Sequence, residues 1–135
     1  MSELTQVLHR FFHDLDERRY DAMLDRFTED CLWLRQGKWL AGKAAVREAL
    51  ETRAADVDTR HVMSNTWVRS LGDDGAVLEA YMTAYRYPTT AAGETAPTIS
   101  SPLRFNLTTT VFRRDAALGW RIAEQRMVTA FNFAG

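Results

Sequence analysis

The 135-residue sequence has a single cysteine, Cys31, which excludes an internal disulfide and any metal site built from cysteines. It also lacks an excess of either charge. Its 17 Lys and Arg residues and 18 Asp and Glu residues leave a net charge of −1, which argues against general binding to nucleic acid or membranes. Apolar runs reach only a few residues, far short of the roughly 18 that cross a bilayer. Because residues 1–10 are polar and contain no apolar signal-peptide core, we expect a cytoplasmic protein.

Motifs for several other chemistries are missing too. The sequence has no glycine-rich phosphate loop and no G-x-S-x-G elbow. His9 and His13 have the i, i+4 spacing of a metal pair, but no third ligand accompanies them, so we interpret them as solvated surface histidines. Cys31 is interpreted as a small buried residue rather than a nucleophile. We therefore expect neither a metal nor another cofactor.

The first part of the chain is patterned as helices. One apolar stripe at helical spacing predicts a helix from about residue 3 to 18. A second, short helix is expected to end near residues 28–30, and residues 31–34 read as a strand. Gly42 precedes a third helix, which loses its pattern near Arg53.

The second part of the chain is patterned as long strands, which are rich in Val, Thr, Tyr, Trp and Phe and cover residues 60–70, 76–87, 103–114 and 120–133. Residues 88–102 hold all three prolines and are expected to form a mobile loop or a lid. Helices followed by long strands predict one α+β domain over residues 1–135. We expect a curved, mainly antiparallel sheet with three N-terminal helices on its concave face, enclosing a cone-shaped pocket.

Several short motifs then resemble a known family. They read LDERRYDAML at 15–24, FTEDCLW at 27–33, GKAAV at 42–46, TRHVMSN at 59–65 and GWRIAE at 119–124. Their order and spacing are similar to those of SnoaL-like proteins in the nuclear transport factor 2-like (cystatin-like) superfamily. The resemblance extends to scytalone dehydratase and to ring-hydroxylating dioxygenase β subunits. This superfamily hosts dehydratases, cyclases, isomerases, epoxide hydrolases and non-catalytic subunits, so the resemblance implies a fold more firmly than a reaction.

The resemblance also points to a catalytic pair. In the scytalone dehydratase branch, a histidine at the T-R-H-like position and an aspartate at the end of the first helix form an acid/base pair, and these positions fall on His61 and Asp16. Helical periodicity alone does not choose between Asp14 and Asp16. The alternative is structural: His61 is a core histidine bonded to a helix end, and Asp16 caps the helix or pairs with Arg18 or its neighbour Arg19.

Strand alternation supplies candidates for substrate contact. It places His61 on one face with Met63, Asn65 and Trp67. The predicted substrate-binding residues are Trp33, Met63, Asn65, Tyr81 and Tyr85. Arg104, Asn106 and Thr108 share one side of a later strand, which fits either a dimer face or a polar pocket wall.

Two departures from the family's catalytic branches stand beside these matches. No histidine follows His61, and residues 108–110 are threonines where many relatives carry a carboxylate. The sequence therefore predicts a small-molecule lyase, isomerase or cyclase that uses Asp16 and His61 on a hydrophobic cyclic or aromatic substrate. The alternative is a non-catalytic binding or assembly domain resembling a dioxygenase β subunit. In either case we expect a homodimer formed through the outer face of the sheet, with neither nucleic acid nor a membrane as partner.

Overall fold

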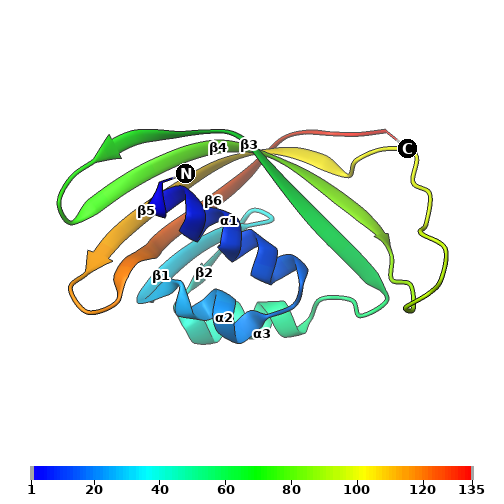
Figure 1. The fold of residues 1–135 in the computed structure, drawn as a ribbon, viewed down its shortest axis with the longest axis horizontal. Coiled ribbons are helices and arrows are strands. Elements are labelled where there is room, and N and C mark those ends of the chain that lie inside the picture. Colours follow the sequence, from blue (N-terminus) through cyan, green and yellow to red (C-terminus); the bar gives the residue numbers. More distant parts are fainter. Residues whose placement is uncertain (1, 135) are drawn as a thin grey trace.

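The structure, a computed structural model, describes residues 2–134. This part of the chain forms three helices and six strands, shown in Figure 1. The helices are α1 (Glu3–Asp16), α2 (Tyr20–Asp25) and α3 (Lys43–Glu51); the strands are β1 (Phe27–Arg35), β2 (Lys38–Ala41), β3 (Val57–Leu71), β4 (Gly75–Pro88), β5 (Arg104–Asp115) and β6 (Gly119–Asn132). No helix among the described residues is long and apolar enough to cross a membrane.

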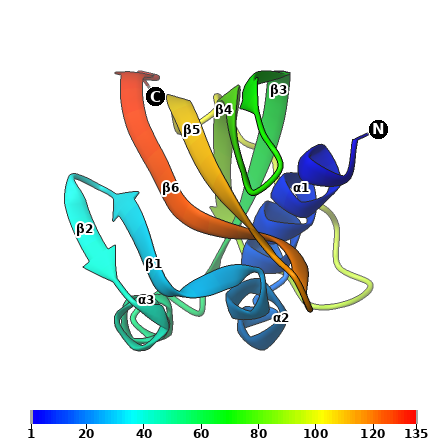
Figure 2. The same ribbon diagram turned by 90° about the vertical axis from the view of Figure 1, so that its left-hand side faces the viewer.

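All six strands belong to one mixed sheet, in the order β2-β1-β6-β5-β4-β3. Only β1 and β6 run parallel, and every other neighbouring pair is antiparallel. Figure 2 shows that the sheet curls without closing and that the three helices lie on its inner side. The α+β fold with a curved, mainly antiparallel sheet and three N-terminal helices is thus confirmed.

Helix α1 forms for the reasons that its sequence indicates. The Ser2 hydroxyl accepts a hydrogen bond from the Thr5 backbone N–H at 3.1 Å and caps the first turn. The apolar stripe is buried along its length, and the Phe11 ring makes edge-on contacts with Phe12, Phe27 and Trp33. This stripe fixes α1 against the sheet, so the last turn of the helix is held close to β3.

The boundary between α2 and β1 differs from the sequence-based expectation. Helix α2 ends at Asp25, and β1 already begins at Phe27. Phe27 was expected on the helix, but its ring enters the core from the strand, where Cys31 and Trp33 are also buried. The parallel pairing of Phe27 with Ile122 on β6 explains the early start, because long-range pairing outweighs local helical spacing.

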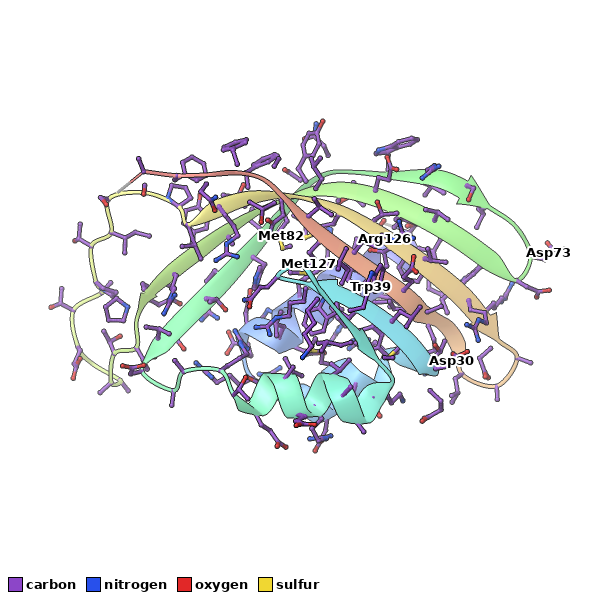
Figure 3. All side chains as sticks on the ribbon, turned by 180° about the vertical axis from the view of Figure 1, so that it is seen from behind. Asp30, Trp39, Asp73, Met82, Arg126 and Met127 are labelled. Carbon is purple, nitrogen blue, oxygen red and sulfur yellow. The ribbon has the colours of Figure 1, made fainter. Side chains whose placement is uncertain are left out.

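The strand registers define two faces of the sheet. On the inner face, His61, Ala84 and Arg104 lie side by side on β3, β4 and β5. The next row inside contains Met82 and Asn106, and Figure 3 shows Met82 and Met127 between the sheet and the helices. On the outer face, Tyr81, Leu107 and Val128 form a row of exposed apolar side chains.

A bulge in β3 changes the face predicted for one residue. Asn65 has a φ of 52° and is the extra residue between Ser64, which pairs with Tyr81, and Trp67, which pairs with Glu79. Simple alternation put Trp67 on the face of His61, and this expectation is wrong. The bulge shifts the alternation by one, so Trp67 shares the outer face with Glu79 and is 54% exposed.

Residues 89–103 connect β4 to β5 without forming a helix or strand. Part of this segment, Thr98–Leu103, lines a hollow of about 450 Å³ together with Val57, Arg86–Pro88 and Phe133. That position is close to one end of the site described below, because Leu103 also lines the cavity at His61. Closure of the segment as a lid stays a prediction.

Candidate active site

The C-terminal end of α1 meets the first half of β3 at a buried contact between Asp16 and His61. One carboxylate oxygen of Asp16 lies 2.5 Å from His61 Nδ1, and the other accepts the backbone N–H of His61 at 2.9 Å. Both side chains are largely buried, with 7% of Asp16 and 11% of His61 exposed. The expectation that these two side chains lie within hydrogen-bonding reach is confirmed.

The structure also decides between the two aspartates at the end of α1. Asp14 is buried as well, but its carboxylate pairs with Arg26 Nε at 3.1 Å, away from His61. Asp16 pairs with His61 rather than with Arg18, whose guanidinium donates to the carbonyl oxygens of Ala54 and Val57. Each aspartate therefore has its own cation or imidazole partner.

This contact assigns the protons of the imidazole. A carboxylate can only accept hydrogen bonds, so Nδ1 of His61 carries its proton toward Asp16, and neutral His61 keeps an unshared electron pair on Nε2. Within residues 2–134, Nε2 has no hydrogen-bond partner. The ring packs at 5.6 Å from the Phe12 ring, centroid to centroid, which limits its rotation. Held in this way, Nε2 is available to accept a proton.

His61 lines a small cavity of about 100 Å³ between the sheet and the end of α1. The cavity is walled by residues from five strands, from the last turn of α1 and from the segments beside them. Its main polar side chains are Arg35, Gln36, Arg53, Thr59, Arg104, Asn106 and Thr129, and its apolar side chains are Leu15, Ala84, Leu103 and Met127. The Asn106 amide oxygen accepts from Thr129 at 3.0 Å, which orients the amide nitrogen as a free donor.

Three guanidinium groups converge on this cavity. Arg35, Arg53 and Arg104 come from β1, from the turn after α3 and from β5, and all three also line an adjoining hollow of about 270 Å³. Burial lowers the pKa of Arg35 below its ordinary value, and the positive charges of Arg53 and Arg104 lower it further, against an opposing effect of Tyr20. The three positive charges are therefore close enough to act on one another.

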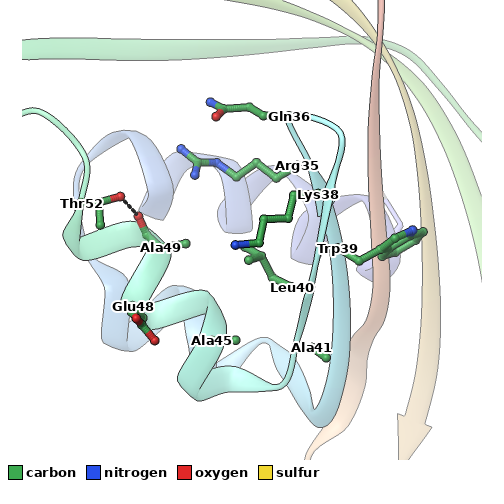
Figure 4. A pocket seen from close by; sticks show the side chains of 10 residues that line it. All are labelled: Arg35, Gln36, Lys38, Trp39, Leu40, Ala41, Ala45, Glu48, Ala49 and Thr52. Carbon is green, nitrogen blue, oxygen red and sulfur yellow. Dashed lines mark hydrogen bonds between the residues drawn. The ribbon is translucent and has the colours of Figure 1, made fainter.

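A third hollow, of about 560 Å³, opens on the other side of Arg35 between β2 and α3. Figure 4 shows Arg35 reaching from β1 toward the last turn of α3, while Lys38 and Leu40 point into the hollow and Trp39 points away toward β6. Arg35 is common to the linings of the cavity at His61, of the adjoining hollow of about 270 Å³ and of this hollow beside α3. Its side chain thus lies between the space near His61 and the space beside α3 and contacts both.

Comparison with known proteins adds a family to this geometry. The family model described as the SnoaL-like domain matches residues 1–126. The chain belongs to the SnoaL-like family. No curated protein sequence matches it.

Solved structures agree with this SnoaL-like fold. A candidate aromatic ring hydroxylase from Novosphingobium aromaticivorans is 21% identical, with a TM-score of 0.77 over 98% of this chain and 90% of that one. A candidate scytalone dehydratase from the same organism is 14% identical, with a TM-score of 0.77 over 98% and 86%. ActVI-ORFA from Streptomyces coelicolor is 18% identical, with a TM-score of 0.77 over 95% of both chains. At these identities the likeness establishes the fold alone.

Besides the catalytic pair, the sequence predicted five substrate-binding residues in this SnoaL-like protein, and none of the five lines the cavity at His61. Trp33 is fully buried in the core, where its Nε1–H points to Met127 Sδ at 3.3 Å. Met63 is half-buried against the same core, and Asn65 is exposed at the bulge. Tyr81 and Tyr85 share the outward-facing side of β4, with Tyr81 43% exposed. Substrate contact by these five residues stays a prediction.

Three further residues singled out in the sequence fall outside the site. His13 is exposed, whereas His9 is half-buried, so the expectation of two solvated histidines is wrong for His9. Its Nε2 is inaccessible to solvent and unpartnered among the described residues, and burial lowers the His9 pKa. Cys31 is fully buried, and burial raises the pKa of its thiol to about 11. The described residues contain no group of three His, Cys, Asp or Glu side chains placed to hold a metal.

The arginines are the part of the site that sequence reasoning missed. Arg104 was noted as part of an alternating polar side, and the structure places it on the inner, cavity side. Arg35 is the last residue of β1 and Arg53 comes just after α3, and neither belongs to a motif or to a periodic pattern. The available signal was the unusual abundance of arginine over lysine in a chain without net positive charge.

Proposed function

We propose that this SnoaL-like protein is an enzyme that catalyses proton transfer next to a carbonyl group of a cyclic or aromatic substrate. The observation that carries the proposal is the buried Asp16–His61 contact at a cavity wall, with Nε2 of His61 left free. A carboxylate that holds one imidazole nitrogen as a donor leaves the other as a general base. The pair thus has the parts that such a reaction needs.

In the proposed reaction, Nε2 of His61 removes a proton from the carbon beside the carbonyl. The electrons of the broken C–H bond move into the new C–C double bond, and those of the carbonyl move onto its oxygen to give an enolate. The Asn106 amide on the cavity wall is suited to stabilise that oxygen. The imidazolium of His61 then returns the proton.

The fate of the enolate decides the class of enzyme. Return of the proton to another carbon gives an isomerase, and expulsion of a neighbouring hydroxyl as water gives a lyase. Attack of the enolate on a second carbonyl gives a cyclase. One structural neighbour is a candidate scytalone dehydratase, which supports the lyase class without deciding it.

A second candidate function is a non-catalytic binding or assembly domain. The observation that favours it is the second bond of Asp16, which accepts the backbone N–H of His61 and so ties α1 to β3. A purely structural role requires this hydrogen bond between α1 and β3 but does not require a free Nε2 on His61. The likeness to a candidate aromatic ring hydroxylase also leaves this alternative open.

We also propose a homodimer formed through the outer face of the sheet, in the cytoplasm. Support comes from the exposed row of Tyr81, Leu107 and Val128 and from the stacked pair of Phe105 and Phe131 beside it. Apolar surface of this kind marks interfaces between protein chains. The single, buried thiol of Cys31 is compatible with a reducing compartment.

The catalytic proposal is tested by hydrogen–deuterium exchange. The protein is mixed with 1-indanone in D₂O, and NMR follows the exchange of the protons beside the carbonyl. We expect the wild type and the exposed-histidine control His13→Gln to accelerate the exchange equally, and His61→Gln to lose the acceleration by roughly 10²–10⁴-fold. Equal exchange by wild type and His61→Gln, or no acceleration by either, would contradict the proposal.

A further inference from the structure

The cavity at His61 has an unbalanced charge. Its described lining residues and those of the adjoining hollow include Arg35, Arg53 and Arg104 but no Asp or Glu. The adjoining hollow adds Arg18 and Arg86, and of these two only Arg18 has an acidic partner within residues 2–134, namely Asp58 at 3.8 Å. Asp16 is not among these lining residues, and its carboxylate already accepts two hydrogen bonds from His61.

The guanidinium groups differ in the hydrogen bonds that they already make within the protein. Arg53 donates to Leu15 O at 2.8 Å, to the Tyr20 hydroxyl at 2.9 Å and to Thr59 Oγ1 at 2.7 Å. All three acceptors are neutral, so Arg53 is held in place while its charge stays uncompensated. Arg104 is different, because its Nε is shut off from solvent and has no hydrogen-bond partner among the described residues. A buried donor without an acceptor costs stability, so the protein satisfies the guanidinium of Arg104 less completely than that of Arg53.

We propose that the substrate of this site carries a carboxylate group, which binds to Arg35, Arg53 and Arg104. That the bound anion is a substrate rests on the proposed acid–base function of His61. The binding of an anion depends only on the three arginines. Guanidinium groups recognise carboxylates through paired, charge-assisted hydrogen bonds. The negative charge of the ligand balances the cluster, and its oxygens accept hydrogen bonds from the guanidinium groups that line the cavity.

The register sets the spacing between His61 and Arg104. His61 and Arg104 sit in one inner-face row with Ala84 between them, and strands are spaced by roughly 4.8 Å, so their Cα atoms are about 10 Å apart. Both side chains line the same cavity. One small molecule can therefore place a carboxylate at Arg104 and a carbon at Nε2 of His61.

The size of the cavity supports the same assignment. About 100 Å³ is less than the roughly 300–1,000 Å³ of ordinary ligand pockets, so a cyclic substrate has to extend into the adjoining hollow. That hollow shares Arg35, Arg53 and Arg104 with the cavity. Any ligand that reaches His61 from this side passes all three cations.

Binding is measured without catalysis, by NMR titration of ¹⁵N-labelled protein with benzoate and with its neutral isostere benzamide. We expect benzoate to bind roughly 10- to 100-fold more tightly, as one or more charge-assisted hydrogen bonds imply. Benzoate should also shift the side-chain Nε–Hε signal of Arg104. Equal affinities for benzoate and benzamide would overturn the proposal.

The matched variants are Arg104→Gln and Arg10→Gln, which remove the same charge. Arg10 is exposed on α1 and lines none of the hollows described above. We expect Arg104→Gln to lose the preference for benzoate and Arg10→Gln to keep it. A preference that persists in Arg104→Gln would place the anion elsewhere and refute the assignment. Arg53 is unsuitable for the test, because its three hydrogen bonds hold the fold together.

Two further experiments distinguish this inference from binding of a simple anion and from the catalytic proposal. Inorganic phosphate is titrated in parallel, and binding as tight as that of benzoate would reject an organic carboxylate in favour of a simple anion. The titration is also repeated with His61→Gln. If benzoate still binds through Arg104 while indanone exchange does not depend on His61, the anion site stands and the catalytic proposal fails. If exchange depends on His61 but benzoate shows no preference, only this inference fails.

Discussion

Replacing Asp16 with asparagine should move a proton on His61 without unfolding the protein. The amide oxygen of the introduced side chain can keep the bond to the His61 backbone N–H, which is now 2.9 Å from Asp16 Oδ2. The amide nitrogen then faces Nδ1 of His61, where the carboxylate oxygen stands at 2.5 Å. Two donors cannot face each other, so we expect the imidazole proton to shift from Nδ1 to Nε2. The nitrogen that faces the cavity thereby loses its ability to accept a proton.

The structure allows the size of the two effects to be compared. Asp16→Asn exchanges one charge-assisted bond for a neutral one, which costs about 1–2 kcal/mol of the free energy of unfolding. For a chain of this length, that corresponds to a fall in Tm of roughly 3–8 °C. Loss of the general base should slow exchange by roughly 10²–10⁴-fold, equivalent to about 3–5 kcal/mol in the barrier. Activity should therefore fall much further than stability.

Long-range ¹H–¹⁵N spectra of the His61 ring distinguish the two tautomers directly. We expect the wild type to carry its proton on Nδ1 and Asp16→Asn to carry it on Nε2. Thermal denaturation on the same samples gives the accompanying change in Tm. The reasoning fails if Asp16→Asn keeps the wild-type tautomer, or if the tautomer shifts while the indanone exchange rate is preserved.

Three further predictions concern other parts of the chain. Burial lowers the pKa of His9 below its ordinary value of 6.5. The contribution of neutral His9 to the stability of the fold is therefore fully present above pH 6.5 and is lost as the pH falls toward the pKa of the folded protein. His9→Gln should flatten the fall in Tm below pH 6.5, whereas the exposed control His13→Gln should leave that fall unchanged. Cys31, with a thiol pKa of about 11, should resist iodoacetamide at pH 8 in the folded protein and react once the protein is unfolded by urea, and rapid labelling of the native state would contradict its burial. Light scattering should give about twice 15.4 kDa for the wild type and for Leu118→Glu, a control in the β5–β6 turn, but 15.4 kDa for Phe131→Glu on the outer face; a monomeric wild type at micromolar concentration would rule out a stable dimer.

The long periodic segments were predictable from the sequence because their pattern matches their burial. The stripe of α1 and the four long strands follow simple spacing, and the structure confirms them with shifts of a few residues. The beginning of β1 was not predictable, since Phe27 fits a helical face as well as a strand and only its pairing with Ile122 on β6 decides. The bulge at Asn65 was equally hidden, because one inserted residue leaves no change in composition while reversing the face of Trp67.

Part of the site could also be predicted from the sequence, and part could not. The contact between Asp16 and His61 could be predicted because a family resemblance links two positions that are 45 residues apart in sequence. The arginine cluster could not be predicted, because Arg35, Arg53 and Arg104 meet only through the curl of the sheet and the packing of α3. Charged side chains carry no periodic signal when they line a cavity, since their positions resemble those of ordinary surface residues.

The most direct test of the central claim is a double-mutant cycle on Asp16 and His61, read as the indanone exchange rate per folded molecule. If the two residues act as one acid–base unit, Asp16→Asn and His61→Gln should each lower the rate by roughly 10²–10⁴-fold, and the double variant should lose little more than either single one. If the contact is only a latch between α1 and β3, the three variants should have a lower Tm but the same rate per folded molecule as the wild type. That second result would contradict the catalytic account.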